Sequence, residues 1–312
     1  MLNFHHKVLW CLALCATVST LRAEVLVILP ETGGMARAGL SIQQGIESAN
    51  QVNGANINFK FVNAHGNSMA SLYKNHVNKK TQLVIGPLAR QDVENLLKLD
   101  PKIPVLALNE IEGKHKNVLQ FSLSKDADAQ ALANVFIQDK LETLYVLRQA
   151  EAESESESFL NLIKQKFSGN IEFVEDVPKK IKKNQGVLLL GNNQWINALK
   201  KLPSKNIYAQ AIAIADNQPM PIGLKFCDVP AIYQAKWPDV IQSYQKQPTS
   251  MPYQRLLAFG GDAWEISQAM LKDKSLKNFS FSGRTGYIQV VDGEIQRMPI
   301  CFMNTKKGLA VI

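Results

Sequence analysis

Short apolar runs alternate with amphipathic segments along most of this chain, and this alternation constrains the fold more than any other feature. Residues 25–29 form the first apolar run, and Ile42, Ile46 and Ala49 then recur at helical spacing. A strand without polar positions must be covered on both faces, as in a parallel sheet flanked by helices. The order of elements therefore predicts an α/β fold built from mostly parallel sheets.

The alternation runs twice, which predicts two similar lobes. The first run has strands expected at 25–29, 57–62, 83–85, 105–108 and 118–121. The second has a helix expected at 129–137 and strands at 144–147, 171–174, 187–190 and 207–211. A long helix over 251–271 and a hairpin that turns at Asp292-Gly293 follow, since Asp-Gly suits a tight turn between strands.

The N-terminus has the features of a secretory signal peptide over residues 1–23. Lys7 precedes an apolar stretch over 8–21, and Ala23 is a small residue at the expected cleavage site. Cys15 raises the alternative of a lipid anchor. Because a lipid-modified cysteine needs a small residue just before it, and Leu14 stands there, we expect export to the periplasm without a lipid at Cys15.

Several classes of function are excluded by the composition and the motifs. With 46% hydrophobic and 20% charged residues the chain is a folded protein rather than a disordered one. After residue 23 no apolar run is long enough to span a membrane. The chain contains no nucleophile elbow, metalloprotease pair, phosphate-binding loop or dinucleotide fingerprint, and its histidines are scattered. We therefore expect no enzymatic activity, no cofactor and no metal site.

Two charged stretches stand out. Glutamate alternates with serine or alanine over residues 151–158, which is typical of a solvated loop but also of an acidic lip. Basic residues gather in the second lobe: Lys179, Lys180, Lys182, Lys183, Lys200, Lys201 and Lys205. They form either an ordinary soluble surface or a face for an anionic partner. We expect no nucleic-acid binding, because no aromatic residues are interleaved with these lysines.

Several segments resemble the type I periplasmic-binding-protein fold. They are ILPETGGMARAGLSIQQGIESA, VIGPLARQDVENL, IPVLALNE and FSLSKDADAQALANVF. More narrowly, VIGPLARQDV, PVLALN, FGGDAWEIS and GRTGYIQVVDGEIQR resemble the LppC-type penicillin-binding-protein activators. The resemblance implies lobe 1 from 24–122 plus 249–280 and lobe 2 from 123–248 plus 281–312. Three crossovers, near residues 122, 248 and 281, would join them.

The same resemblance leaves two functions open. The chain is either a regulator that binds a class A penicillin-binding protein and stimulates peptidoglycan synthesis, or a solute receptor of an ABC importer. Peptidoglycan or a small molecule would be the other ligands. Amino-acid receptors of this fold hold the ligand with hydroxyls and amides after the third strand. Leu88 and Ala89 replace the expected hydroxyls here, which favours the regulator.

The candidate site is the cleft beyond the carboxyl ends of the lobe 1 strands, where ligands of open α/β sheets bind. Arg37 and Arg90 would add positive charge there, while Gly33 and Gly34 either support a site or only permit a turn. The predicted cleft-lining residues are Thr32, Gly33, Gly34, Arg37, Leu88, Ala89, Arg90, Gln91, Asn109 and Glu110.

Two cysteines, Cys227 and Cys301, remain after the signal peptide. They lack the spacing of a redox motif, and the periplasm allows oxidation. Two interpretations stay open: a disulfide bond within lobe 2, or two buried free thiols.

Overall fold

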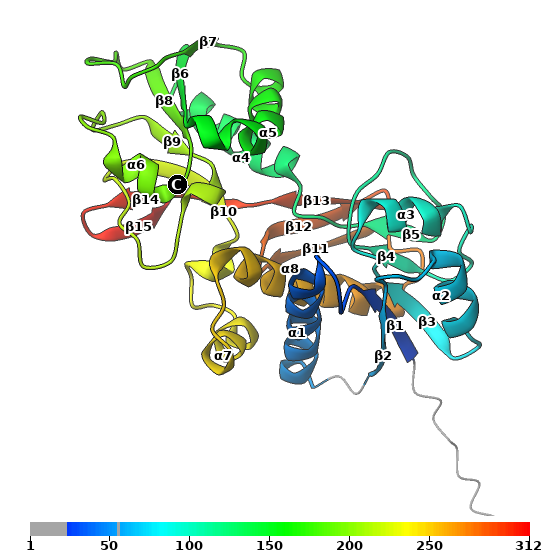
Figure 1. The fold of residues 1–312 in the computed structure, drawn as a ribbon. Coiled ribbons are helices and arrows are strands. Elements are labelled where there is room, and N and C mark those ends of the chain that lie inside the picture. The colour runs from blue at the N-terminus through cyan, green and yellow to red at the C-terminus, as the bar shows by residue number, and fades with distance from the viewer. Residues whose placement is uncertain (1–23, 55–56) are drawn as a thin grey trace, which may run out of the picture.

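The computed structural model describes residues 24–54 and 57–312, so the predicted signal peptide and Cys15 lie outside the described residues. Within that part the chain folds into two α/β lobes and a small third sheet (Figure 1). The prediction of two lobes is confirmed, because the strands divide into separate sheets rather than one continuous sheet.

The first sheet is parallel, with the strand order β2-β1-β3-β4-β5. Its strands are β1 (Glu24–Leu29), β2 (Asn58–Asn63), β3 (Thr81–Ile85), β4 (Val105–Ala107) and β5 (Val118–Gln120). Its helices are α1 (Ala36–Val52), α2 (Met69–His76) and α3 (Arg90–Leu97). These elements agree with the sequence pattern, and Val118–Gln120 form a fifth strand.

The second sheet repeats this order in its parallel part, β7-β6-β8-β9-β10, and adds the antiparallel strands β14 and β15 at one edge. Its strands are β6 (Thr143–Arg148), β7 (Asn170–Phe173), β8 (Gln185–Leu190), β9 (Ile207–Ala209), β10 (Leu224–Asp228), β14 (Ile300–Thr305) and β15 (Gly308–Val311). Its helices are α4 (Lys125–Gln138), α5 (Glu153–Lys166) and α6 (Asn193–Ala198). The acidic stretch therefore lies mostly in the first turns of α5 rather than in a loop.

The alternation of side chains in β1 shows how the first lobe is held together. Val25, Val27 and Leu29 pack into a core with α1 and the C-terminal helix α8 (Met251–Lys272). Leu26 and Ile28 point the other way, into a core with α2 and α3. All five side chains are buried, which is the physical reason why this strand has no polar position.

Helix α8 packs along α1 through glycines. A Cβ atom on Gly260 would lie 2.1 Å from the carbonyl oxygen of Ile42, and one on Gly45 would lie 2.0 Å from that of Leu257. Each glycine therefore lets one backbone approach the other. This close packing offsets the low helix propensity of Gly260 and Gly261 inside α8.

The third sheet consists of β11 (Asn278–Gly283), β12 (Gly286–Val291) and β13 (Glu294–Met298), all antiparallel. The predicted turn at Asp292-Gly293 is present, with positive φ angles at both residues. Ile288 and Val290 pack into the core of lobe 1. The prediction had assigned residues 281–312 to lobe 2. Because of these core contacts, we propose to extend lobe 1 through residue 298 and to place the third crossover at Pro299.

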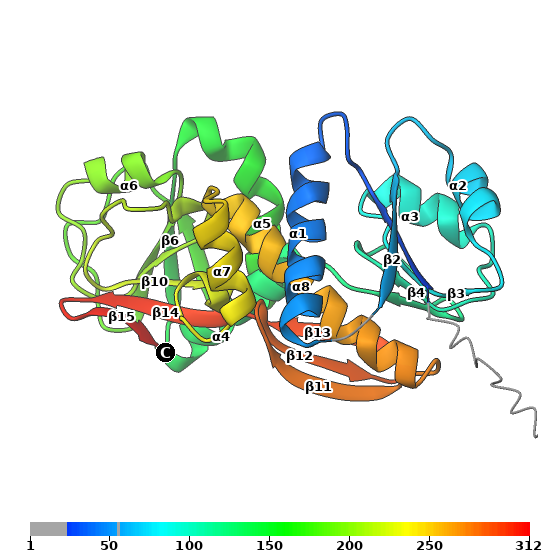
Figure 2. The same cartoon turned by 90° about the horizontal axis from the view of Figure 1, so that it is seen from below.

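Between the lobes lies α7 (Pro238–Lys246), in a region for which the sequence pattern gave no prediction. It packs against α1 of lobe 1, and Figure 2 shows the two helices side by side near the middle of the molecule. The hydroxyl groups of Ser48 in α1 and Ser243 in α7 lie 2.5 Å apart. A segment that follows the lobe 2 strand β10 is thereby fixed to lobe 1.

Candidate functional site

The loop after β1 holds three of the predicted cleft residues. The Thr32 hydroxyl accepts a hydrogen bond of 2.9 Å from the Asn63 side chain, which ties this loop to the end of β2. Gly33 has a φ of 77°, and a Cβ atom there would lie 2.5 Å from the His65 ring. A Cβ atom on Gly34 would have no heavy atom within 4 Å. The glycine at position 33 is thus required by the local conformation and by the neighbouring histidine.

The loops after β3 and β4 contact each other. Gly86 has a φ of 98°, and a Cβ atom there would lie 2.2 Å from the carbonyl oxygen of Ile28. Leu88 is buried and belongs to the lobe 1 core, beside the partly buried Ala89. The Asn109 amide donates a hydrogen bond of 3.0 Å to the Leu88 carbonyl. The packing of the two loops against each other therefore accounts for the glycine at position 86, the leucine at 88 and the asparagine at 109.

The charged and amide side chains of the candidate site are exposed and engaged locally. The Arg37 guanidinium lies 4.1 Å from the centre of the Tyr253 ring of α8, a cation–π contact. Arg90 lies 3.6 Å from Glu94 one turn along α3, and the Gln91 amide donates to the same carboxylate. The described contacts therefore link Arg90 and Gln91 to Glu94 of their own helix and Arg37 to α8, rather than joining all three in one polar cluster.

Glu110 is the candidate residue that borders large cavities. It lines a groove of about 860 Å³ beside the β12–β13 hairpin and a second of about 820 Å³ between α4 and β13. Burial raises the pKa of the Glu110 carboxyl, although a hydrogen bond with Ser122 and the charge of Arg297 oppose that shift. Glu110, whose backbone N–H donates to the Asn109 side chain, thus lies at the junction between lobe 1 and the first crossover.

Three buried arginine–aspartate groups cross the junction of the lobes, and the sequence analysis did not find them. In the first, Arg255 of α8 donates two hydrogen bonds, of 2.8 and 2.6 Å, to the carboxylate of Asp228 at the end of β10. The Tyr233 hydroxyl donates to the same carboxylate at 2.6 Å. Burial and the adjacent charge of Asp228 raise the pKa of Tyr233, so its hydroxyl stays protonated.

The second group is centred on Arg284, at the turn between β11 and β12. Its guanidinium lies 2.6 Å from Asp239 of α7 and 3.3 Å from Asp262 of α8. Asp262 is fully buried and also accepts hydrogen bonds from the backbone N–H of Arg284 and from Thr285. Burial raises the pKa of Asp262, and the positive charge of Arg284 opposes this shift. This group joins α7, α8 and the third sheet.

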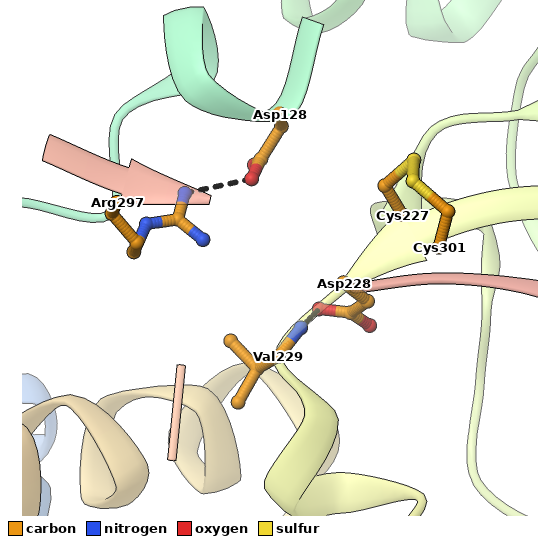
Figure 3. Close-up of a disulfide and its surroundings, with 6 residues drawn as sticks. All are labelled: Asp128, Cys227, Asp228, Val229, Arg297 and Cys301. Atoms are coloured by element: carbon orange, nitrogen blue, oxygen red, sulfur yellow. Dashed lines mark hydrogen bonds and ion pairs between the residues drawn. A yellow bond between two sulfur atoms is a disulfide. The ribbon is translucent and has the colours of Figure 1, made fainter. Parts of the chain in front are cut away.

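The third group pairs Arg297 of β13 with Asp128 of α4 at 2.7 Å (Figure 3). Arg297 also donates to the carbonyl oxygens of Ser124 and Thr285. Burial raises the pKa of Asp128, while Arg297 opposes this shift. Because α4 belongs to lobe 2 and β13 packs on lobe 1, this pair spans the first crossover.

A disulfide bond joins Cys227 and Cys301 close to this junction (Figure 3). The two residues face each other in the antiparallel ladder of β10 and β14, with their Cα atoms 3.9 Å apart. The bond fixes β14, which follows the third crossover, to the central part of the lobe 2 sheet.

The acidic stretch at the start of α5 is partly neutralised. Arg148, the last residue of β6, lies 2.8 Å from Glu153 and 2.5 Å from Glu157. Glu151 and Glu155 instead line a small pocket of about 110 Å³ at the ends of the lobe 2 strands.

Two general features of the described residues bear on function. Over residues 24–54 and 57–312 the side chains of His, Cys, Asp and Glu form no group of three that could hold a metal ion. Within the same range no helix is long and apolar enough to cross a membrane.

Comparison with known proteins gives a match to a family model and a relative by sequence. A family model described as "LppC putative lipoprotein" matches residues 12–202. The penicillin-binding protein activator LpoA of Haemophilus ducreyi is 23% identical over 296 residues, which are 86% of this chain and 50% of that protein. The chain therefore spans about half the length of the curated relative it matches.

Two solved structures of known proteins share the fold of this chain. The C-domain of LpoA from Haemophilus influenzae, described as a regulator of PBP1A, matches with a TM-score of 0.72 and 18% identity. The match covers 93% of this chain and all of that domain. LivJ of Streptococcus pneumoniae, a substrate-binding protein solved with isoleucine, matches with a TM-score of 0.55 and 13% identity, over 93% of this chain and 99% of LivJ. The predicted type I periplasmic-binding-protein fold is confirmed.

Proposed function

This chain belongs to the LppC family, and from that premise we propose that it is a non-enzymatic regulator of a class A penicillin-binding protein. In this proposal it binds the synthase in the periplasm and stimulates peptidoglycan synthesis. The observation that carries the proposal is the family match over residues 12–202, and the likeness to a domain described as a regulator of PBP1A supports it.

The junction of the lobes supports a scaffold role. Opening or closing the lobes would disturb the buried contacts of Arg255, Arg284 and Arg297, and removing one partner from a buried ion pair costs about 3–5 kcal/mol. A surface that is already fixed loses less conformational entropy when a partner binds. We therefore propose that the chain presents a largely preformed surface to the synthase.

The environment of the buried carboxylates supports a role without catalysis. Asp228 and Asp262 accept hydrogen bonds from arginine, hydroxyl and backbone donors. A general base needs a free lone pair within hydrogen-bond reach of a substrate proton. Asp228 instead joins β10 of lobe 2 to α8, and Asp262 joins α8 to the third sheet.

The alternative function is that of a solute receptor for an ABC importer. The likeness to LivJ, which was solved with isoleucine, is the observation that favours it. A small-ligand site needs a few convergent polar groups between apolar walls. Among the exposed polar side chains of the candidate site, Arg37 contacts Tyr253 of α8, whereas Arg90 and Gln91 both contact Glu94 of their own helix. They do not converge on one ligand-sized cage, which favours the regulator.

We propose that the chain acts in the periplasm without a lipid anchor. The family description names a lipoprotein, but Cys15 follows the bulky Leu14. Mass spectrometry of the protein from a periplasmic fraction tests this proposal. The expected mass is that of a chain beginning at Glu24, and a diacylglyceryl-modified Cys15 at the N-terminus would contradict it.

A binding experiment separates the two functions. The purified class A synthase is immobilised, and this chain is titrated over it by surface plasmon resonance, with LivJ as a control protein of the same fold. Calorimetry with free amino acids runs in parallel. We expect saturable binding of this chain to the synthase, none of LivJ, and no heat with amino acids. Micromolar binding of an amino acid without synthase binding would favour the importer receptor.

A further inference from the structure

A groove of about 810 Å³ lies at the end of lobe 2 opposite the carboxyl ends of its strands. It is lined by three loops, at residues 138–142, 181–184 and 203–206, which precede the strands β6, β8 and β9. We call it the lysine groove, because Lys140, Lys182, Lys183 and Lys205 lie on its three loops. Its volume is in the range of ligand-binding clefts.

The four lysines are exposed, and their charge is not neutralised by the protein. Among the residues that the structure describes, none of their ammonium groups lies within 4.0 Å of a carboxylate. The lining also contains Asp139, but that carboxylate is engaged by Lys225 at 2.5 Å and by the Tyr208 hydroxyl.

Glu142, the other carboxylate of the lining, accepts a hydrogen bond from the Asn184 amide. Both acidic groups of the groove are therefore used inside lobe 2. The groove consequently presents a positive potential to solvent, to which Lys179, Lys180, Lys200 and Lys201 on the adjoining loop segments add.

The backbone at Lys140 adds an independent observation. This residue follows α4 and has a φ of 56°, a left-handed conformation that glycine or asparagine adopts most easily after a helix. Lys201 has a φ of 61°. A lysine at such a position bears a backbone strain that glycine would avoid. The N–H groups of Lys140 and Leu141 donate to the carbonyl oxygens of Ile137 and Phe136, so this conformation ends α4 and places the Lys140 side chain on the groove.

The shape and lining of the groove determine the kind of partner. It is concave, so a flat bilayer cannot enter it, and the apolar side chains in the described part of its lining are Ile181 and Pro203. Among the described residues, the lining has no aromatic ring on which a base or the face of a sugar could stack. We propose that the lysine groove binds an acidic segment of a protein partner, whose aspartate and glutamate side chains lie between the three loops.

A peptide of about ten glutamates, labelled with fluorescein, tests the proposal by fluorescence anisotropy, with a polyserine peptide of the same length as the neutral probe. We expect saturable binding of the acidic peptide alone. It should weaken when ionic strength rises from about 0.1 to about 1 M, since the Debye length then falls from about 10 to about 3 Å. This probe contains no synthase, so its outcome is independent of the function proposed above.

The matched variants carry the same change in net charge. In the first, Lys182, Lys183 and Lys205 are replaced by glutamate. In the second, the exposed lobe 1 lysines at 74, 79 and 80 are replaced by glutamate. We expect the groove variant to bind the peptide about tenfold more weakly and the lobe 1 variant to change by less than about twofold. Circular dichroism and thermal melting confirm that both variants are folded.

Three results would overturn the proposal. One is an equal loss of affinity in both variants, which would mean that only net charge matters. Another is the absence of saturable peptide binding at low ionic strength. The third is a groove-dependent binding of phosphatidylglycerol vesicles or of purified peptidoglycan without binding of the peptide, which would assign the groove to a lipid or a glycan.

Discussion

Replacing Gly260 by alanine should destabilise the protein, because α8 touches α1 at this residue. The added Cβ atom would lie 2.1 Å from the carbonyl oxygen of Ile42, whereas ordinary contacts begin at 3.4 Å. The obstacle is backbone in the middle of a helix, so it cannot rotate away as a side chain would. The two helices must therefore part by about 1 Å, and they lose van der Waals contacts along their interface.

The expected size of the effect follows from two opposing contributions. Overpacking a well-filled core costs about 1–3 kcal/mol, and an unyielding backbone contact belongs near the upper end of that range. Alanine recovers about 1 kcal/mol of helix propensity relative to glycine. We therefore expect G260A to lower the free energy of unfolding by about 2 kcal/mol, which corresponds to a fall in Tm of about 4 °C.

Urea unfolding followed by circular dichroism measures this effect, with G34A as the matched control. A Cβ atom on Gly34 has no heavy atom within 4 Å, and its φ is not in the left-handed region. We expect G34A to stay within about 0.5 kcal/mol of the wild type. If G260A were as stable as the wild type, or more stable, the close approach of α1 and α8 would be wrong.

Three further predictions concern the junction and the disulfide. Arg284→Met leaves the buried carboxylate of Asp262 unpaired and should lower the free energy of unfolding by about 3–5 kcal/mol. Urea unfolding measures this loss, and an unchanged urea midpoint would contradict the buried pair. Burial raises the pKa of Glu110, so the wild type should lose stability as pH rises through the interval between the unfolded and folded pKa values. Thermal melting at a series of pH values should therefore show that Glu110→Gln loses less stability than the wild type over that interval. Parallel plots of Tm against pH for the two proteins would refute the raised pKa of Glu110. Replacing Cys227 and Cys301 by serine opens a loop with a sequence separation of 74 and should lower the free energy of unfolding by about 4 kcal/mol. A loss below about 1 kcal/mol, measured by urea unfolding, would contradict a stabilising disulfide bond.

Much of the fold could be predicted because its signals are local. The buried strand β1 has no polar position, and Ile42, Ile46 and Ala49 of α1 follow at helical spacing. The long helix at 251–271 differs from α8 by one residue at its C-terminal end. The turn at Asp292-Gly293 was predictable because few other residue pairs adopt positive φ angles so easily.

The middle of the chain was not predictable in the same way. Strand β10 includes Lys225 and Asp228, which are paired with Asp139 and Arg255 far away in sequence. These polar residues interrupt the apolar pattern, so the strand has no clear local signal. The short helix α7 begins at Pro238 and buries Asp239 against Arg284, a contact that only the folded chain creates.

The candidate site illustrates the same limit. The loops that hold Thr32, Leu88 and Asn109 follow the predicted strands, but their contacts with each other are tertiary. A usable signal for the junction was nevertheless present in the sequence. Asp262 is a charged residue between Gly261 and the apolar pair Ala263-Trp264, and a charge in such a position is usually buried and paired.

The rate of glycan polymerisation from lipid II, catalysed by a purified class A penicillin-binding protein, tests the proposed regulation most directly. This chain is titrated into the reaction, and LivJ is titrated into a parallel reaction as the control of the same fold. The account predicts that the rate rises with this chain, saturates near equimolar amounts and does not change with LivJ. A rate that stays constant over the whole titration would contradict the regulator.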